Sequence, residues 1–503
     1  MISIDGLLEK VNDRLNPIVV KELRQAVQGK FLIVVLICFL CLQLLAVGLF
    51  LTDEAVTHSF RAGQIVFQFL LGILLGTCLL FVPAYTGIRL AGERADANVD
   101  LLFITTLRPR SIIWGKFFAG LVITILLYSA CMPFMTFTYL LRGVDLPSVF
   151  ILLALDFIVV AVSIQCGILI GCIPANRALK VILGVVWLVV TIVAFVTLLA
   201  AMFVPGGLLT SGLGSQLNSW NFWRGALGVL VAGGTLIGLL ALLSIALISP
   251  VSVNRALPVR IFATAAWILT GIGAAIWSIG VNDYAPIGLW AVLHILLHSV
   301  GLFIAVSERE SLGQRVRRTI PRRWFLRPLG FLFYSGDAGG VVWSSLMIIL
   351  TLLFVGAWLS VFPQMHTGSE IDEGIGALVS LGLYAFSYTL GASLIRRRFF
   401  ADRIAHRYTW VIALILLGIT TTIIPLGLFF LYGDWNKEWL VASPLGALLF
   451  SETKGYVSNS IAIASVCAIF VGMVSLPWFV SRVSDFRPLR EETTTNLQTN
   501  ESG

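Results

Sequence analysis

Charged side chains are scarce in this sequence. Asp, Glu, Lys and Arg make up 12% of its residues, about half the share found in soluble proteins, whereas hydrophobic residues make up 58%. This composition excludes an ordinary soluble domain. Apolar runs of about 18 residues or more recur along the chain, and each is long enough to cross a hydrocarbon core about 30 Å thick as a helix.

Motifs for catalysis, nucleotide binding and metal binding are also missing. The Gly-Lys pairs at 29–30 and 115–116 are both followed by Phe, so the G-x-x-x-x-G-K-[ST] loop that holds ATP phosphates does not occur. The zinc-protease, nucleophile-elbow and paired-cysteine zinc patterns are absent as well. We therefore expect that the chain is not an enzyme, has no catalytic, cofactor-binding or metal-binding residues, and leaves any ATP hydrolysis to a partner.

The cysteines give no sign of a disulfide framework. Thiols within apolar runs pack as small apolar groups, and this includes the Cys38-x-x-Cys41 pair. All seven cysteines lie in such runs: Cys38, Cys41, Cys78, Cys131, Cys166, Cys172 and Cys467.

The apolar runs predict an all-α, polytopic membrane protein with about twelve transmembrane helices. Backbone groups in lipid must be hydrogen-bonded within the segment, which favours helices over loops. The predicted spans are about 31–51, 64–87, 117–141, 148–173, 181–204, 226–249, 261–281, 287–306, 340–362, 376–395, 409–432 and 461–481.

The few basic residues are distributed unevenly. If residues 1–30 are cytoplasmic and the chain crosses at every predicted span, 29 of the 34 Lys and Arg residues fall on the cytoplasmic side. Basic residues resist translocation, so this asymmetry predicts that both termini are cytoplasmic. The net charge of +8 therefore indicates topology rather than nucleic-acid binding. No cleavable signal peptide is recognisable, and we expect a multi-pass protein of an energy-coupling membrane such as the bacterial inner membrane.

The chain is predicted to contain two six-helix membrane domains, 31–250 and 261–481, followed by a disordered cytoplasmic tail, 482–503. Residues 1–30 predict an amphipathic helix at the membrane interface, with Asn16 as its N-cap and Pro17 as its first residue. Apolar side chains line one face (Val19, Leu23, Ala26 and Val27), and polar side chains line the other (Lys21, Glu22, Arg24, Gln25 and Gln28).

Each predicted domain has its longest cytoplasmic segment after its second helix, at 88–116 and at 307–339. The two segments begin alike, with Gly92-Glu93-Arg94 and Ser307-Glu308-Arg309. The second segment contains a basic run at 315–327, for which two interpretations stay open. It is either a topology anchor on anionic lipid or a docking site for a partner.

Three ionisable side chains lie within predicted spans: Asp156, His294 and His298. Such residues are costly in lipid and commonly functional. One hypothesis is that Asp156 and one histidine meet across a helix contact and line a substrate or proton path. The alternatives are an interhelical hydrogen bond with a structural role only, or a metal or haem bound by the two histidines, which share a helix face.

A polar, helix-prone stretch from 93 to 116 interrupts the apolar runs, and much of it is in register with a known motif. It resembles a motif of the permease subunits of type-2 ATP-binding cassette exporters. The matching residues are Glu93, Arg94, Leu101, Leu102, Thr105, Leu107, Ile112, Gly115 and Lys116, with a carboxylate kept at Asp100, whereas Ala95, Ala97, Asn98, Thr106 and Ser111 depart from the motif. Upstream, Asn16-Pro17-Ile18-Val19-Val20-Lys21-Glu22-Leu23-Arg24 is similar to the interfacial N-terminal helix of that family. The resemblance covers about residues 16–250.

The resemblance implies a short coupling helix, at about Val99–Thr106, that rests in a groove of a separate cytoplasmic ATPase subunit. Asp100 is then near the positive end of the helix dipole, and Pro109 ends the turn before the next helix. Arg108 and Arg110 are expected to face the ATPase or the lipid headgroups. The expected partner-coupling residues are Glu93, Asp100, Leu101, Leu102, Thr105, Leu107, Arg108 and Arg110.

The function that we predict is that of a membrane-spanning permease subunit of an ATP-driven transporter. Export is the direction that the resemblance implies. The expected partners are the ATPase subunit, the lipid bilayer, and a second copy of the chain or a second permease. A proton- or ion-coupled secondary transporter and a non-transporting membrane scaffold stay open as alternatives, and dependence of transport on ATP separates the first of these from the permease.

Overall fold

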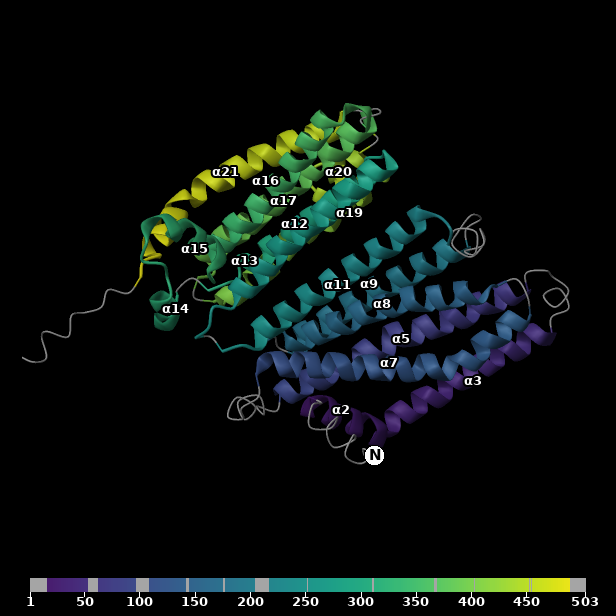
Figure 1. Cartoon of the computed structure of the whole chain (residues 1–503). Coiled ribbons are helices and arrows are strands. Elements are labelled where there is room, and N and C mark those ends of the chain that lie inside the picture. The colour runs from purple at the N-terminus through teal and green to yellow at the C-terminus, as the bar shows by residue number, and fades with distance from the viewer. Residues whose placement is uncertain are drawn as a thin grey trace, which may run out of the picture. The chain divides into compact units, whose positions relative to one another are not determined.

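Helices make up the regular structure of this chain, as the computed structural model in Figure 1 shows. The structure describes residues 16–52, 62–95, 108–141, 144–174, 177–203, 217–250, 252–309, 312–365, 369–401, 403–451, 453 and 455–488. Within these ranges no strand occurs, and twelve helices are long and apolar enough to span a membrane. The prediction of an all-α, multi-pass membrane protein with twelve spans is therefore confirmed.

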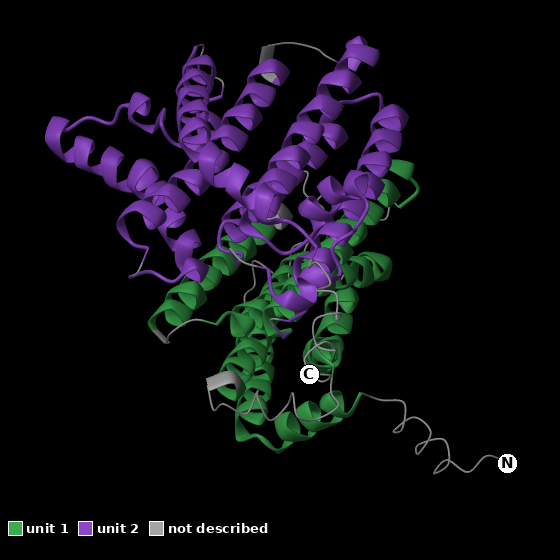
Figure 2. Cartoon of the chain, turned by 90° about the vertical axis from the view of Figure 1, so that its left-hand side faces the viewer, with its two compact units in different colours: residues 1–249 green, residues 250–503 purple. Residues whose placement is uncertain are grey.

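The helices fall into two units, residues 1–249 and residues 250–503, which are coloured separately in Figure 2. Each unit contains six of the membrane-length helices. Unit 1 consists of α2 (Pro17–Gln28), α3 (Lys30–Thr52), α5 (Ala62–Ala95), α7 (Pro109–Leu140), α8 (Leu146–Cys172), α9 (Arg177–Phe203) and α11 (Trp220–Ile248).

Helix α2 is separated from the first membrane-length helix by one residue. Asn16 begins it by accepting a hydrogen bond from the backbone N–H of Ile18, 3.1 Å away, and Pro17 occupies the first helical position. Gly29 has extended backbone angles, φ −76° and ψ 125°, which end α2 and allow α3 to leave in a new direction. The position of α2 at a membrane interface and the cytoplasmic location of the two termini stay predictions.

Helices α5 and α8 form the centre of unit 1 through direct contact of their backbones. A Cβ atom on Gly87 would lie 2.6 Å from the carbonyl oxygen of Gly167, and one on Gly171 would lie 2.7 Å from the carbonyl oxygen of Gly87. Gly167 and Gly171 have the G-x-x-x-G spacing that permits close helix packing in membranes. One face of α5 is completely buried, with the side chains of Leu70, Leu71, Leu74 and Leu75 at 0% exposure.

Unit 2 has the same number of membrane-length helices but more short segments between them. Its long helices are α12 (Ala256–Val281), α13 (Ala285–Ala305), α16 (Asp337–Val361), α17 (Ser369–Phe399) and α21 (Tyr456–Asp485). The remaining span is built from η3 (His406–Tyr408), α18 (Thr409–Gly418), the π-helical turn η4 (Ile419–Ile423) and α19 (Ile424–Tyr432). The short elements are α14 (Gln314–Arg318), η1 (Trp324–Leu326), α15 (Arg327–Phe333), η2 (Pro363–Met365), η5 (Lys437–Leu440) and α20 (Pro444–Leu449).

The core of unit 2 contains a buried stripe on α13 that packs on α16 and α17. Ile287, Ala291, Ile295 and Leu302 are all at 0% exposure, and their spacings of four, four and seven residues put them on one helix face. The histidines of α13 lie on the same buried side of the helix.

Two cytoplasmic segments predicted from the sequence contain more helix than their hydropathy indicates. Helix α5 continues to Ala95 and α7 begins at Pro109, so that both ends of the 88–116 segment are helical. In the 307–339 segment, α14, η1 and α15 are formed. Hydropathy detects the length of a lipid-facing run, whereas polar residues with good helix propensity extend the helix beyond it.

Candidate functional site

Asn16 connects the start of α2 to the start of α7. While its side-chain oxygen caps α2, its Nδ2 donates a hydrogen bond of 2.7 Å to the backbone oxygen of Ser111. One side chain therefore both begins α2 and holds the first turn of α7, which lies within the segment that carries the permease-like motif.

Helices α2 and α7 come into close contact at Gly115, which has no side chain to keep them apart. A Cβ atom at this position would lie 2.8 Å from Cβ of Ile18 and 3.0 Å from Nδ2 of Asn16. The first distance is shorter than real Cβ contacts allow and the second is unusually tight, so a larger residue at 115 would push α2 and α7 apart. The Gly of the motif is thus explained by the close approach of the N-terminal helix.

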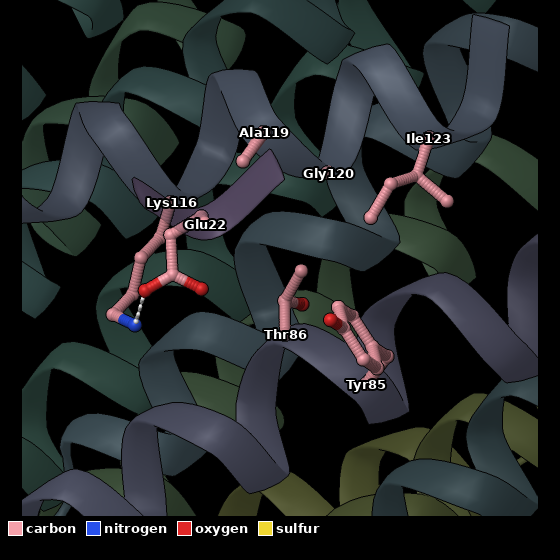
Figure 3. A pocket seen from close by; sticks show the side chains of 7 residues that line it. All are labelled: Glu22, Tyr85, Thr86, Lys116, Ala119, Gly120 and Ile123. Carbon is pink, nitrogen blue, oxygen red and sulfur yellow. Dashed lines mark hydrogen bonds and ion pairs between the residues drawn. The ribbon is translucent and has the colours of Figure 1, made fainter. Parts of the chain in front are cut away.

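A buried ion pair follows one residue later. Nζ of Lys116 lies 2.6 Å from Oε1 of Glu22 and 2.9 Å from Oε2 of Glu93. The side chain of Lys116 is 3% exposed and that of Glu22 is 7% exposed. The first of these pairs is drawn in Figure 3, where Glu22 on α2 and Lys116 on α7 point toward each other. Charges this deeply buried are tolerated only when they are paired.

Two further cations complete the group, which we call the α2 charge cluster: Lys21, Glu22, Arg89, Glu93 and Lys116. Nη1 of Arg89 lies 3.7 Å from Oε2 of Glu22, and Nζ of Lys21 lies 3.4 Å from Oε1 of Glu93. Arg89 also donates to the side-chain oxygen of Gln25. The cluster joins three helices, α2, α5 and α7, and its Glu22–Lys116 pair connects residues 94 positions apart in the sequence.

The cluster encloses space for no more than a water molecule. A small pocket beside the Glu22–Lys116 pair has a volume of about 10 Å³, which is at the lower limit for one water. Figure 3 shows the residues that line it: Glu22, Tyr85, Thr86, Lys116, Ala119, Gly120 and Ile123. The arrangement suits a structural joint between helices rather than a site for an organic ligand.

Unit 2 has a comparable ion pair at Glu308, which has the position of Glu93 in the similar beginning of the second cytoplasmic segment. Nη2 of Arg260, whose side chain is 3% exposed, lies 2.6 Å from Oε2 of Glu308. The same oxygen accepts a hydrogen bond of 2.8 Å from the backbone N–H of Gly336, next to the start of α16. In both units, a glutamate at the end of the second membrane-length helix (Glu93) or just after it (Glu308) is thus paired with a buried cation.

The predicted partner-coupling residues divide into two groups. Glu93 belongs to the α2 charge cluster, and Arg108 and Arg110 are exposed at the N-cap and in the first turn of α7. Asp100, Leu101, Leu102, Thr105 and Leu107 lie outside the described residues, as does the predicted coupling helix at 99–106. The described part of the chain shows the two helix ends that flank this segment, both tied to α2.

Sequence reasoning missed the burial of Glu22. This residue, assigned to the polar face from the sequence, is 6% exposed, while Val27, assigned to the apolar face, is 64% exposed. A spacing of four residues places Ile18, Glu22 and Ala26 on one side of α2, and all three are buried against the rest of unit 1. The signal that could have identified the site is the presence of oppositely charged residues in both of the stretches that resemble the permease family.

Asp156 on α8 is the most isolated of the ionisable groups that the sequence places within the spans. Its side chain is 3% exposed, and its Oδ2 accepts no hydrogen bond from any described residue. In the same unit, Oε1 of Gln43 and the hydroxyl of Tyr128 are likewise buried without a hydrogen-bond partner among the described residues. Unit 1 therefore contains polar groups within its apolar core that its own described side chains leave unsatisfied.

The histidines of α13 have defined surroundings in unit 2. Nε2 of His294 lies 2.9 Å from Oγ1 of Thr270, which donates its own hydrogen to the backbone oxygen of Ala266. The same hydroxyl oxygen accepts a hydrogen bond of 3.0 Å from Nε1 of Trp290, and the tautomer of His294 decides which partner donates in the His294–Thr270 hydrogen bond. The ring of His298 lies 6.1 Å from that of His294 and 5.1 Å from that of Trp343.

The described residues show neither a site for the substrate or proton path nor one for the metal that the sequence suggests at these histidines. Asp156 is in unit 1 and both histidines are in unit 2, so their meeting stays a prediction. Within the described ranges, no group of three or more His, Cys, Asp or Glu side chains is placed to hold a metal ion.

Comparison of the whole chain with profiles of protein families, with characterised proteins and with solved structures finds no match. The resemblance to type-2 ATP-binding cassette permeases therefore depends on the residues named above, six of which (Asn16, Lys21, Glu22, Glu93, Gly115 and Lys116) lie in or against the α2 charge cluster.

Proposed function

We propose that this protein is the membrane-spanning permease subunit of an ATP-driven transporter of the type-2 ATP-binding cassette class, and that it works as an exporter. A separate ATPase subunit binds the cytoplasmic segment 93–116. The proposal includes cytoplasmic termini, an interfacial position for α2 and a location in the bacterial inner membrane.

The observation that carries this proposal is the α2 charge cluster. The residues that resemble the permease motif come from two stretches far apart in the sequence, yet Lys116 bridges Glu22 of the first and Glu93 of the second, at 2.6 and 2.9 Å. Composition or topology alone gives no reason for these particular residues to meet. Their contact supports the interpretation that both stretches serve one mechanism.

The mechanism that we infer is mechanical. The segment 96–107 connects the end of α5 to the start of α7, and the cluster fixes both of these helix ends to α2. A force that an ATPase applies to the segment is then passed to all three helices together, and the long helices tilt as levers. A helix in the interface plane also resists being pulled into or away from the bilayer, because its two faces differ in polarity.

Co-purification in mild detergent tests the proposal. An ATPase with a nucleotide-binding loop is expected to be isolated with the wild-type chain and lost with the double variant Asp100→Lys/Leu101→Asp. The control, Asp402→Lys/Phe399→Asp, also replaces an acidic residue by Lys and an apolar residue by Asp, at sequence positions outside the 93–116 segment, and is expected to retain the ATPase. Absence of such an ATPase from the wild-type sample would refute the proposal.

A proton-coupled secondary transporter is the second candidate, and it is favoured by Asp156. A buried carboxylate oxygen without a hydrogen-bond donor among the described residues is typical of groups that bind a proton or a substrate during transport. Transport that continues without ATP and stops when the proton gradient is dissipated would support this function in place of the first.

A further inference from the structure

The segment between α13 and α16, residues 312–334, is a folded surface element of unit 2. Val316 is 6% exposed and Ile320 is 3% exposed, so one side of the segment is buried. The hydroxyl of Tyr334 donates a hydrogen bond of 2.6 Å to the backbone oxygen of Thr319, which connects the end of the segment to the residue that follows α14. We call this element the arginine segment.

The inner side of the arginine segment is attached to the helix bundle. The ring of Phe331 lies 5.6 Å from that of Phe486 and 6.0 Å from that of Phe479, at the last turns of α21. Arg260 on α12 donates hydrogen bonds of 2.7 and 2.8 Å to the backbone oxygens of Leu332 and Tyr334. The segment is thus fixed at the end of the bundle where α16 begins and α21 ends, as Figure 1 shows for α14 and α15.

Its outer side is apolar where a soluble surface would be polar. Trp324 is 79% exposed, Leu329 is 55% exposed and Phe325 is 54% exposed. The rings of Trp324 and Phe325 in η1 lie 6.3 Å apart, and Leu329 follows in α15. Large exposed apolar groups that are fixed in this way mark a surface that is covered by lipid or by another molecule.

The charge of the segment identifies the chemistry of its partner. Residues 312–334 contain six arginines and no Asp or Glu. Arg315, Arg318, Arg322 and Arg323 are exposed, the last two directly before Trp324. Tryptophan beside arginine at the ends of membrane-length helices is typical of the headgroup level of a bilayer, where basic clusters attract anionic lipids.

We infer that the arginine segment binds anionic phospholipid. Trp324, Phe325 and Leu329 lie at the boundary between acyl chains and headgroups, and the exposed arginines contact the lipid phosphates. The bilayer is the occupant because six arginines without an acidic residue match anionic headgroups, and the exposed Trp324, Phe325 and Leu329 beside them match acyl chains. This inference does not depend on the transport function, since an anchored segment would serve a permease or a scaffold equally.

Lipid retention by the full-length protein tests the inference. The purified chain in a neutral detergent is mixed with phosphatidylglycerol or phosphatidylcholine, and bound lipid is counted by native mass spectrometry. Wild type is expected to retain phosphatidylglycerol preferentially, and Arg318→Gln/Arg322→Gln/Arg323→Gln is expected to weaken that retention about tenfold or more. Glycerol 3-phosphate, which has the headgroup chemistry without acyl chains, is expected not to displace the lipid.

The matched control removes three other exposed arginines from unit 2, Arg398→Gln/Arg403→Gln/Arg407→Gln, and is expected to change retention less than about twofold. An equal loss in both triple variants would refute the inference, because generic positive charge would then explain binding. Equal retention of the two lipids by wild type would refute it as well, and would favour a protein as the occupant of the surface.

A second measurement does not depend on the arginine variants. Brominated phosphatidylglycerol quenches the fluorescence of tryptophans near the acyl chains, and Trp324→Phe is expected to remove part of this quenching. Because Trp324 is 79% exposed, the substitution leaves the packing of the segment intact. Identical quenching of wild type and variant would place Trp324 outside the lipid and overturn the inference.

Discussion

Replacement of Lys116 by methionine tests the α2 charge cluster most directly. The substitution keeps the length of the apolar stem and removes the ammonium group with its charge and its hydrogen-bond donors. It leaves the carboxylate of Glu22, whose side chain is 7% exposed, without its partner at 2.6 Å. Loss of one member of a buried ion pair costs about 3–5 kcal/mol, since the remaining charge stays buried.

We expect the lower end of this range for the free energy of unfolding, about 3 kcal/mol, because other cations remain nearby. Arg89 lies 3.7 Å from Glu22, and Lys21 lies 3.4 Å from Glu93. The side chain of Lys21 is 54% exposed, so Lys21→Met is the matched control and is expected to cost less than about 1 kcal/mol.

The measurement is denaturation of the full-length protein by sodium dodecyl sulfate in mixed micelles, followed by circular dichroism. The double variant Glu22→Gln/Lys116→Met is expected to lose about 1–3 kcal/mol less of the free energy of unfolding than the two single variants lose in total, since the residues are in direct contact. The reasoning is refuted if Lys116→Met costs no more than Lys21→Met, or if the effects of the two cluster substitutions add.

The other predictions use the same unfolding assay. Gly115→Ala is expected to destabilise the protein by about 1–3 kcal/mol, because its Cβ would lie within 2.8 Å of α2. The matched control Gly92→Ala, with open space around its Cβ, is expected to be neutral or stabilising, and equal effects would contradict the close packing at 115. Asn16→Ala should cost about 0.5–2 kcal/mol by removing the cap of α2, whereas full stability of this variant would show that the cap is dispensable. Asp156→Asn should leave stability unchanged or raise it, because a buried carboxylate without a hydrogen-bond donor is costly; a clear loss would show that Asp156 has a structural partner.

The membrane class and the number of spans could be predicted because hydropathy is a local property. Each span is long enough to be recognised from its own residues, and the distribution of Lys and Arg restricts the number of crossings. The positions where α5 ends and α7 begins were harder to predict from the sequence. Arg89, Glu93 and Arg110 are polar and lie in helical extensions beyond the apolar runs.

The site could be predicted only in part because its contacts are non-local. Glu22 was assigned to the solvent face since charged residues are rarely buried alone, and its partner Lys116 is 94 residues away. Nothing in the local pattern of α2 indicates that partner. The folded arginine segment was missed for a similar reason, because Phe331 is held by Phe479 and Phe486 from the last helix.

The close backbone contact of α5 and α8 has a consequence for the order in which unit 1 is assembled. These two helices are separated in the sequence by α7, so α5 enters the bilayer before the helix that it packs against has been synthesised. During that interval lipid chains cover the groove at Gly87, and the later insertion of Gly167 and Gly171 on α8 displaces them. Assembly of the unit then depends on the fourth membrane-length helix: a chain that stops before α8 still has α3 and α7 against α5, but the Gly87 face of α5 lacks the helix that it packs on.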